Sequence, residues 1–383
     1  MKNRILAVVL ALTMVILCLT ACKKGNADTE TVDNTVEENN EEEEAEIPSP
    51  DVAKRIEPKV KVRGIYVTGA AAGKDTMDEL IELCDRTDIN AMVIDVKDDL
   101  GNITYNMDLD MVKEIGAVYE YVSDMPALIE KLHEHDIYCI ARIVCFKDPI
   151  LAKGRDDLAL KLLSGEYVVD GHGNPFVNPY KKEVHEYIVS VAKKAIEIGF
   201  DEIQFDYVRF PIGEDADNAD YGVNTKRYTK MKCISSFFTY CETEFHKEGI
   251  IFGADLFGTI IGSDLDEEAT GQVYKDIAMK ADNVCPMIYP SHFANGNFGL
   301  DVPDAKPYEA ILGALGRSSK ALEVLSEESR AYVRPWLQAF TAPWVPGHIE
   351  YKLAEIKAEI QAVYDAGYDE WILWNAGSFY DYE

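Results

Sequence analysis

The chain has 383 residues, and its 68 acidic and 38 basic side chains give a formal net charge of −30 at neutral pH. That charge repels phosphate backbones and other polyanions, so it argues against nucleic acid as a partner. With 47% hydrophobic residues, the chain can bury a sizeable core, and the part beyond residue 61 is long enough for one barrel domain.

Residues 1–21 have the composition of a secretory signal. Lys2 and Arg4 form a basic start, an apolar run follows, and small residues precede Cys22. The ending Leu-Thr-Ala-Cys resembles the lipoprotein box of bacteria, which implies that Cys22 becomes the lipidated first residue of the mature protein. An ordinary cleaved signal with an incidental cysteine is the alternative. We therefore expect a protein anchored by lipid to the extracytoplasmic face of the cell membrane.

Residues 22–61 are predicted to form a disordered acidic tether. Between residues 28 and 46 the chain is rich in Asp and Glu and has no basic or aromatic residue. Such a segment cannot bury enough apolar surface to offset the entropy of ordering, and its charges repel one another. We expect a spacer between membrane and domain; an acidic tail that binds a partner is the alternative.

Residues 62–383 alternate short apolar runs with amphipathic helical patterns. The runs are rich in Val, Ile, Phe and Tyr, as parallel strands buried on both faces are. They are Val62–Gly69, Ala91–Lys97, Tyr138–Phe146, Glu202–Phe210, Ile251–Gly258, Asn283–Tyr289, Val333–Phe340 and Glu370–Trp374. Eight such units predict a (β/α)8 barrel, in which glycines 199, 249 and 367 end helices. Because Trp374 lies close to residue 383, the eighth helix is expected to be short or missing, with residues 47–61 as a candidate replacement.

Two lone aspartates near strand ends are the predicted catalytic residues. A polar residue inside an apolar run is costly unless it is used or paired, and barrel enzymes place their sites at the C-terminal ends of the strands. The two-residue period puts Gln204 and Asp206 on the lumen face and Tyr207 and Arg209 on the other side. Asp255 ends the next run in the same way.

These two carboxylates could flank a glycosidic bond. Neighbouring strands are about 4.8 Å apart, and glycosidases use one carboxylic acid as proton donor and a second carboxylate as nucleophile or base. Asp206 would be the nucleophile or electrostatic stabiliser, and Asp255 the general acid/base. The structural alternatives are an Asp206 paired with Arg142 or Arg209 and an Asp255 that caps a helix or pairs with arginine.

Polar and aromatic residues at the other strand ends are the candidate substrate ligands. Asp95 and Lys97 should share a face, as a salt bridge or as ligands, and Arg142 could hold a lumen aspartate ionised. Aromatic faces suit sugar rings, while amides and imidazole suit hydroxyls. The predicted substrate-binding residues are Asp95, Lys97, Arg142, Gln204, Tyr289, His292, Trp336, Gln338, Trp374 and Asn375. No Cys/His metal spacing or calcium-loop spacing occurs, so no metal and no cofactor are expected.

Five strand motifs together resemble a bacterial glycoside hydrolase family of barrel domains that is related distantly to the alpha-amylase-type barrels. The motifs are 63–68 (RGIYVT), 93–98 (VIDVKD), 204–211 (QFDYVRFP), 254–258 (ADLFG) and 286–292 (PMIYPSH). The resemblance implies a (β/α)8 barrel with Asp206 at the nucleophile position and Asp255 at the acid/base position. Asp255 stands where alpha-amylases carry Glu, and Gln204 where they carry Arg.

The expected activity is hydrolysis of an O-glycosidic bond in a cell-surface or environmental polysaccharide. The alternatives are a degenerate barrel that binds glycan without cutting it, and a structural envelope lipoprotein with a protein partner. A monomer is favoured, and the sequence leaves the sugar, the linkage, retention or inversion, and any disulfide pairing open.

Overall fold

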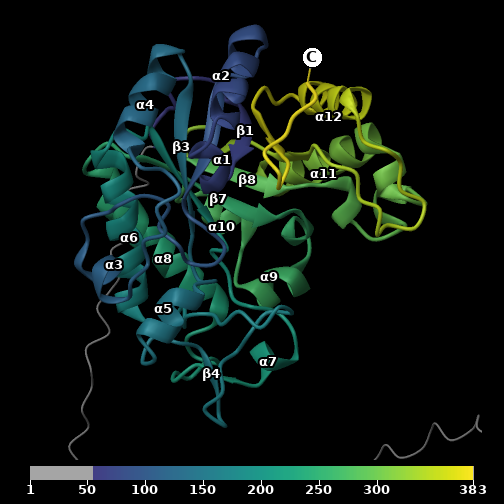
Figure 1. Ribbon diagram of the computed structural model, residues 1–383. Helices are drawn as coiled ribbons and strands as arrows, with labels where there is room; N and C mark the ends of the chain where they lie inside the picture. The colour runs from purple at the N-terminus through teal and green to yellow at the C-terminus, as the bar shows by residue number, and fades with distance from the viewer. Residues whose placement is uncertain (1–54, 383) are drawn as a thin grey trace, which may run out of the picture. The chain divides into compact units, whose positions relative to one another are not determined.

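The computed structural model describes residues 55–382 (Figure 1). The predicted signal of residues 1–21, the lipidation site Cys22 and the tether up to residue 54 lie outside the described residues. Within the described part, no helix is both long and apolar enough to cross a lipid bilayer. The six cysteines described there are buried free thiols.

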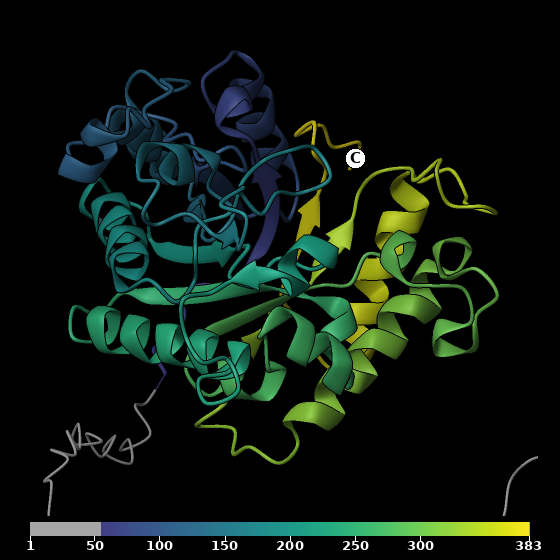
Figure 2. The same ribbon diagram turned by 90° about the horizontal axis from the view of Figure 1, so that it is seen from below.

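Parallel strands at eight positions close into a barrel, as the alternation of apolar runs predicted. The strands are β1 Arg63–Val67, β2 Ala91–Lys97, β3 Tyr138–Val144, β5 Glu202–Asp206, β7 Ile251–Phe257, β8 Asn283–Met287, β9 Tyr332–Val333, β10 Trp336–Gln338 and β11 Trp371–Trp374. The strand at the seventh position is split into β9 and β10 by residues 334 and 335, because Pro335 has no N–H to donate to a neighbouring strand. β11 pairs with β1, so the C-terminal strand lies beside the N-terminal one and closes the barrel (Figure 2).

Helices surround this barrel. The main ones are α2 Thr76–Arg86, α4 Met125–Glu134, α6 Lys182–Glu197, α8 Lys230–His246, α10 Tyr274–Ala278, α11 Pro307–Leu322 and α12 Leu353–Asp365. Shorter elements follow the strands: α1 Gly69–Ala72, α3 Asp110–Glu114, α5 Pro149–Gly154, α7 Glu214–Asp217, α9 Asp264–Thr270, and the 3-10 turns Gly258–Ile260, Pro290–His292, Asn297–Gly299 and Pro303–Ala305. β4 Lys161–Leu162 and β6 Ala219–Asp220 form a separate antiparallel pair.

The helical periodicity explains how the outer layer packs. In α6, Val184, Ile188, Val191 and Ala195 recur three or four residues apart and are all buried. Gly199 follows α6 with a φ of 116°, a conformation that favours glycine and ends the helix before β5. The predicted helix stop at this glycine is therefore confirmed.

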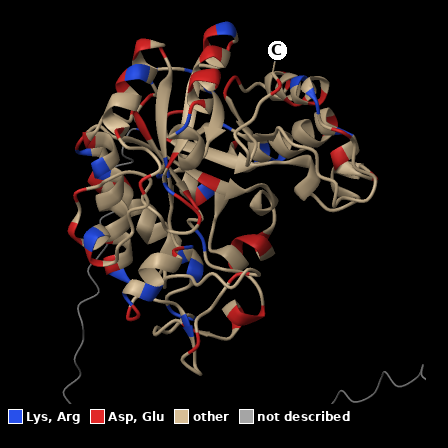
Figure 3. Ribbon diagram, viewed as in Figure 1, with Lys and Arg blue, Asp and Glu red and all other residues tan. Residues whose placement is uncertain are grey.

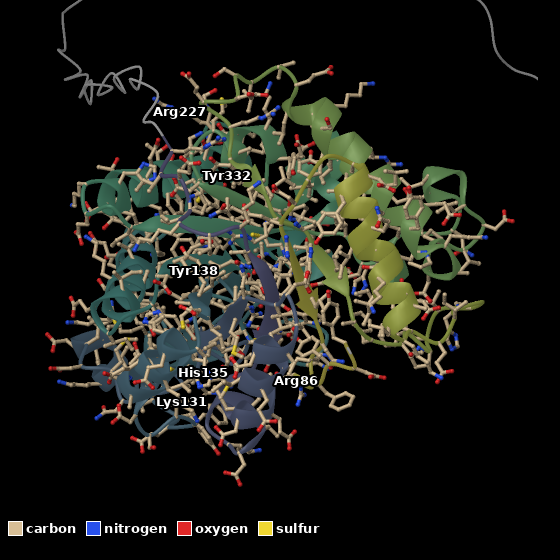
Figure 4. All side chains as sticks on the ribbon, turned by 90° about the horizontal axis from the view of Figure 1, so that it is seen from above. Arg86, Lys131, His135, Tyr138, Arg227 and Tyr332 are labelled. Atoms are coloured by element: carbon tan, nitrogen blue, oxygen red, sulfur yellow. The ribbon has the colours of Figure 1, made fainter. Side chains whose placement is uncertain are left out.

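Ion pairs join neighbouring helices on the surface. Lys131 of α4 pairs with Asp78 of α2 at 2.6 Å, and His135 pairs with Asp85 at 2.9 Å (Lys131 and His135 in Figure 4). Exposed pairs of this kind contribute only about 0.2–1 kcal/mol each, so the buried apolar face holds the helices in place.

No helix follows β11 among the described residues, which confirms the expectation of a short or missing eighth helix. The irregular segment 375–382 packs there instead: Tyr380 donates its hydroxyl to the Tyr66 carbonyl at 2.7 Å, and Tyr382 donates to Asp88 at 3.0 Å. Residues 55–61 do not form the replacement helix. Ile56 N–H donates to Asp282 at 2.6 Å, which places this segment at the N-terminal ends of the strands.

A buried ion cluster fills the barrel at that N-terminal end. Arg334 donates to Glu202 at 2.7 Å and to Glu370 at 2.8 Å, and Tyr138, labelled in Figure 4, donates its hydroxyl to Glu202 at 3.3 Å. Asn283 adds a further hydrogen bond to Glu202 at 3.0 Å. We call Arg334, Glu202 and Glu370 the Arg334 cluster; both of its acids are buried, and Glu202 is closed off from solvent.

Candidate active site

The two predicted catalytic aspartates lie at the C-terminal ends of neighbouring strands. Asp206 is the last residue of β5, and Asp255 lies in β7. Phe205 pairs with Ala254 in the register of these strands, so the two acids occupy the next position along each. Both side chains are buried, and both line one pocket of about 350 Å³. The structure thus brings the two acids to the same hollow.

Arg142 of β3 holds the carboxylate of Asp206 in place. Its Nε and Nη2 atoms donate to Oδ2 of Asp206 at 3.1 and 2.6 Å. The same guanidinium donates from Nη1 to Asp95 at 2.7 Å and from Nη2 to Asp99 at 2.8 Å. Charge-assisted hydrogen bonds of this kind stabilise a carboxylate in its ionised form. We call Arg142, Asp95, Asp99 and Asp206 the Arg142 cluster.

The charges within the Arg142 cluster reinforce one another. Burial alone would lower the pKa of Arg142, but its three carboxylates outweigh burial and raise the pKa well above the ordinary value. Burial would likewise raise the pKa of Asp99, yet the Arg142 guanidinium holds that pKa below the usual range. The cluster therefore keeps a fixed positive charge beside Asp206.

Asp255 has a different environment, with no cation paired to it among the described residues. Its Oδ1 accepts hydrogen bonds from Nε2 of Gln204 and Nε1 of Trp336, both at 2.6 Å. Its Oδ2 is buried and has no hydrogen-bond partner in the described part of the chain. Burial first, and the charge of Asp206 second, raise the pKa of Asp255 well above the usual range of an aspartate. Asp255 is suited to hold a proton on the free Oδ2 atom.

The surroundings therefore differentiate the two carboxyl groups. Both are buried, but Asp206 is bound by an arginine, whereas Asp255 has no cation paired to it among the described residues and favours its protonated form. A protonated acid beside an arginine-bound carboxylate is the arrangement of a general acid beside a nucleophile or stabiliser. The pocket can thus donate a proton and stabilise a developing positive charge at adjacent points.

A left-handed residue turns the chain directly after Asp206. Tyr207 has a φ of 48°, which few side chains adopt, and its N–H donates to Oδ1 of Asp206 at 2.6 Å. The strand alternation ends at this turn. The prediction that Tyr207 and Arg209 lie on the far side of the strand is wrong, because both line the pocket with Asp206.

Several predicted ligands line the same pocket. These residues are Arg142, Tyr289, His292, Trp336 and Trp374. Trp374 stacks on Tyr66 with ring centroids 4.1 Å apart and planes 16° apart. His292 packs edge-on against Tyr289 at 5.2 Å, and burial lowers its pKa, which favours a neutral imidazole. The pocket wall thus combines flat aromatic faces with a few polar groups, as sugar sites do.

Asp95 lies behind Arg142 and faces a second hollow. Its Oδ2 accepts the Tyr66 hydroxyl at 2.7 Å. Burial raises the pKa of Asp95 to about 6, against the opposing effects of Arg142 and Tyr66. The second hollow, about 590 Å³, shares Asp99 and Trp374 with the first.

Four other predicted ligands do not line the pocket. Lys97 is fully buried, donates to the Val144 carbonyl at 2.6 Å and pairs with Asp148 at 2.8 Å. A register shift between Asp95 and Lys97 breaks the alternation, so the predicted pair between them does not form.

The remaining three are held by the protein itself. Gln204 lies beneath the pocket and donates to Asp255, whereas Gln338 is buried and donates to Asp304 at 2.9 Å. Asn375 donates to the Ala339 carbonyl at 2.8 Å. These amides position backbone and acids in the present structure.

Sequence reasoning missed part of the pocket wall. The residues that it did not assign are Asp99, Tyr207, Arg209, Phe257, Gly258, Thr259, Met287, Phe293 and Phe340. Asp99 directly follows the motif at 93–98, and Tyr207 and Arg209 lie within the motif at 204–211. The turn at Tyr207 has no clear sequence signal, so the alternation placed both side chains wrongly.

One group of side chains among the described residues has a metal-ligating composition, and it lies away from the pocket. His133, Cys139 and Asp201 stand at the N-terminal end of β3. Oδ2 of Asp201 already accepts from His133 Nε2 at 2.8 Å and from the Cys139 N–H at 2.9 Å. Burial also raises the pKa of the Cys139 thiol, which disfavours the thiolate that a metal requires.

Solved structures with this architecture include several glycoside hydrolases. The glycoside hydrolase domain of PgaB (BpsB) from Bordetella bronchiseptica is 11% identical over 83% of this chain and 95% of its own, with a TM-score of 0.62. The spore cortex-lytic enzyme SleL from Bacillus megaterium is 11% identical over 84% of this chain and 72% of its own, with a TM-score of 0.51. At this identity the likeness concerns the fold.

A hypothetical protein from Ruminiclostridium thermocellum is more similar in sequence. It is 36% identical over 50% of this chain and 96% of its own, with a TM-score of 0.46. No curated protein sequence matches the chain. Residues 64–380 match the family described as "Putative glycosyl hydrolase domain". This range extends from Gly64 in β1 to beyond β11 and so covers the barrel. With that match over most of its length, the chain belongs to this glycosyl hydrolase family.

Proposed function

We propose that the protein hydrolyses an O-glycosidic bond of a polysaccharide, with Asp255 as general acid/base and Asp206 as nucleophile or stabilising carboxylate. The observation that carries the proposal is the contrast at the pocket between an arginine-bound carboxylate and a buried acid with one free oxygen. In the first step, Asp255 gives its proton to the glycosidic oxygen while the bond to the anomeric carbon breaks. Asp206 faces the positive charge that develops on that carbon.

Water completes the reaction. Once the leaving sugar has departed, Asp255 is ionised and can take a proton from water as the oxygen adds to the anomeric carbon, which restores the starting protonation. Retaining enzymes hold their two carboxyl groups about 5–5.5 Å apart, and inverting ones about 6.5–9.5 Å apart. Proton NMR of the first product distinguishes retention from inversion of the anomeric configuration.

The hollows around the acids favour a chain of sugars over a single one. The pocket and the second hollow share Asp99 and Trp374. Aromatic rings extend beyond both: Trp344 is 63% exposed and stacks on Phe340, and Tyr119 is 57% exposed beside Tyr121 of the second hollow. Exposed flat rings at two ends of a cleft suit a polymer that crosses it.

A surface location agrees with that substrate. We propose that lipid on Cys22 anchors the mature protein to the extracytoplasmic face of the membrane and that residues 22–54 act as its tether, because residues 55–61 contact the barrel. Two measurements test this proposal: membrane fractionation of a Cys22→Ala variant and the mass of the wild-type protein. A variant that still fractionates with membranes, together with a wild-type mass that contains no lipid, would overturn it.

The activity is tested by a reducing-sugar screen of the domain from residue 55 onward on plant, fungal and bacterial glycans. Asp206→Asn should remove turnover by a factor on the order of 10³, because the amide cannot stabilise positive charge. Asp157→Asn, a surface acid paired with Arg155, is the matched control and should keep full activity. Unchanged turnover in Asp206→Asn would end the assignment, and binding without turnover in the wild type would establish the glycan-binding alternative.

A further inference from the structure

Three arginines near the barrel lumen differ in how their charge is balanced. Arg142 contacts three carboxylates and Arg334 contacts two. Among the described residues, Arg209 pairs with no carboxylate, and its guanidinium donates only from Nη1 to the Phe210 carbonyl at 3.1 Å. Most of the N–H groups of its guanidinium are therefore without an acceptor in that part of the chain.

The position of Arg209 directs that unused charge toward the substrate. It lines the pocket together with Asp206 and Asp255. Its guanidinium carbon lies 4.2 Å from the centre of the Phe257 ring and 5.2 Å from that of Tyr207, so aromatic rings fix its plane. Burial lowers the pKa of Arg209, whereas the pKa values of the two carboxylate-bound arginines are raised despite burial. Keeping a charge in such a place without a counter-ion is costly.

Neither acid of the pocket pairs directly with Arg209, although the charge of Asp206 raises the pKa of Arg209 against burial. Oδ2 of Asp206 is occupied by Arg142, and its Oδ1 accepts from the Tyr207 N–H. Asp255 favours its neutral form, and its Oδ1 is taken by Gln204 and Trp336. Arg209 therefore lacks a direct anionic partner among the described residues, and a bound molecule can supply one.

We infer that the pocket binds a sugar residue that bears a carboxylate, with Arg209 as the partner of that group. The inference rests on the proposed glycosidase function and names the substrate class of the same site. The planar fork of arginine matches a carboxylate in a bidentate geometry, which a lysine cannot reproduce. Phe257 lies against the guanidinium, and Met287 and Phe293 line the same pocket, so an apolar wall would strengthen the pair.

The charge around the pocket limits how acidic the glycan can be. The short helices α7 and α9, which follow β5 and β7, carry acidic residues and no basic ones (Figure 3). Dense polyanions are repelled by such a surface, whereas isolated carboxylates are screened beyond about 8 Å at physiological salt. The substrate class is therefore a glycan whose acidic sugars alternate with neutral ones.

The test is binding to a glycan array by a protein that does not turn over. The background is Asp255→Asn, which keeps an acceptor for the Gln204 and Trp336 hydrogen bonds. The array carries uronate-containing glycans, carboxyalkyl-ether glycans, sulfated glycans and their neutral parents. We expect carboxylate-bearing glycans to bind best, and the added Arg209→Gln change to weaken their binding by about tenfold or more, with neutral glycans unaffected.

Two further variants separate recognition from simple loss of charge. Arg209→Lys should recover only part of the affinity for carboxylate-bearing glycans, because the ammonium cannot bind in a bidentate way. Lys147→Gln is the matched control: Lys147 lies 4.7 Å from the centre of the Tyr207 ring but is paired with Asp170 at 3.3 Å. The Lys147→Gln change should not alter the preference of the protein for acidic over neutral glycans.

The inference is overturned by an array on which no carboxylate-bearing glycan binds, on which only sulfated or neutral glycans bind, or on which Arg209→Gln weakens acidic and neutral glycans equally. Circular dichroism and thermal unfolding of each variant establish that it is folded. Because binding is measured without turnover, its outcome is separate from that of Asp206→Asn. A neutral glycan cleaved through Asp206 would sink the inference and leave the proposed function standing.

Discussion

The two ends of the barrel each contain a buried cluster of arginine and carboxylates, and the two clusters differ in their access to a pocket. In the Arg334 cluster, Glu202 accepts from Arg334, Tyr138 and Asn283, and its side chain is closed off from solvent. At the other end, Asp206 of the Arg142 cluster lines a pocket beside Asp255, which lies outside the cluster and whose Oδ2 has no partner among the described residues. A closed cluster contributes to folding, whereas a cluster beside a pocket can also act on a substrate.

The comparison also explains why a raised pKa alone does not identify a catalytic acid. Burial raises the pKa of Glu202 as it does that of Asp255. Only Asp255 combines that shift with a free oxygen and a pocket. The difference lies in access, since a perturbed carboxyl without a route to substrate is a structural feature.

The largest effect on stability is expected at the closed end. Arg334→Met leaves Glu202 and Glu370 buried without their cation, so the free energy of unfolding should fall by about 3–5 kcal/mol in urea titrations. Arg155→Met, which removes a surface partner of Asp157, should cost less than about 1 kcal/mol. Equal effects of the two changes would mean that the Arg334 cluster has no special role.

A smaller effect is expected from a single hydroxyl at the open end. Tyr66→Phe removes the hydrogen bond to Oδ2 of Asp95, so the free energy of unfolding should fall by about 1.5–3 kcal/mol. Tyr105 provides the matched control, because its hydroxyl is buried and has no partner among the described residues. Tyr105→Phe should be neutral or stabilising, and a loss as large as that of Tyr66→Phe would contradict the account.

The pH dependence of stability gives an effect that is read as a slope, at most about 1.4 kcal/mol for each pH unit. The pKa of Asp255 is raised in the folded protein, so its neutral form is favoured and the stability that it contributes is lost as pH rises above the ordinary aspartate value of about 3.9. The free energy of unfolding of the wild type, minus that of Asp255→Asn, should fall with pH by up to about 1.4 kcal/mol per unit. A difference that is flat or rises between pH 4 and 8 would be incompatible with a buried acid.

The sequence was sufficient for the fold and for the central pair of acids. The continuous apolar runs predicted the parallel strands, and lone aspartates near strand ends predicted the positions of Asp206 and Asp255 at a pocket. Both signals are local, because a continuous apolar run and a single aspartate within it can each be recognised from a few consecutive residues of the sequence.

The rest of the site depends on breaks in regular geometry. The register shift before Lys97 and the left-handed turn at Tyr207 each move side chains to the opposite face. Strand periodicity assumes that no such break occurs, so it placed Lys97 among the ligands and Arg209 outside them. The pair of Asp206 with Arg142 was one of the alternatives predicted from the sequence, and it forms. The binding of Asp95 and Asp99 to the same guanidinium was not predicted, because these acids come from a strand and a loop brought together by closure of the barrel.

The most direct test compares two leaving groups in Asp255→Asn on the sugar identified by the glycan screen. A natural glycan needs a proton for its leaving oxygen, so its turnover should fall by about 10²–10⁴-fold. A nitrophenyl glycoside of the same sugar, which leaves without a proton, should retain most of the wild-type rate of bond cleavage. An equal loss with both substrates, or no loss with either, would contradict the role of Asp255 as proton donor.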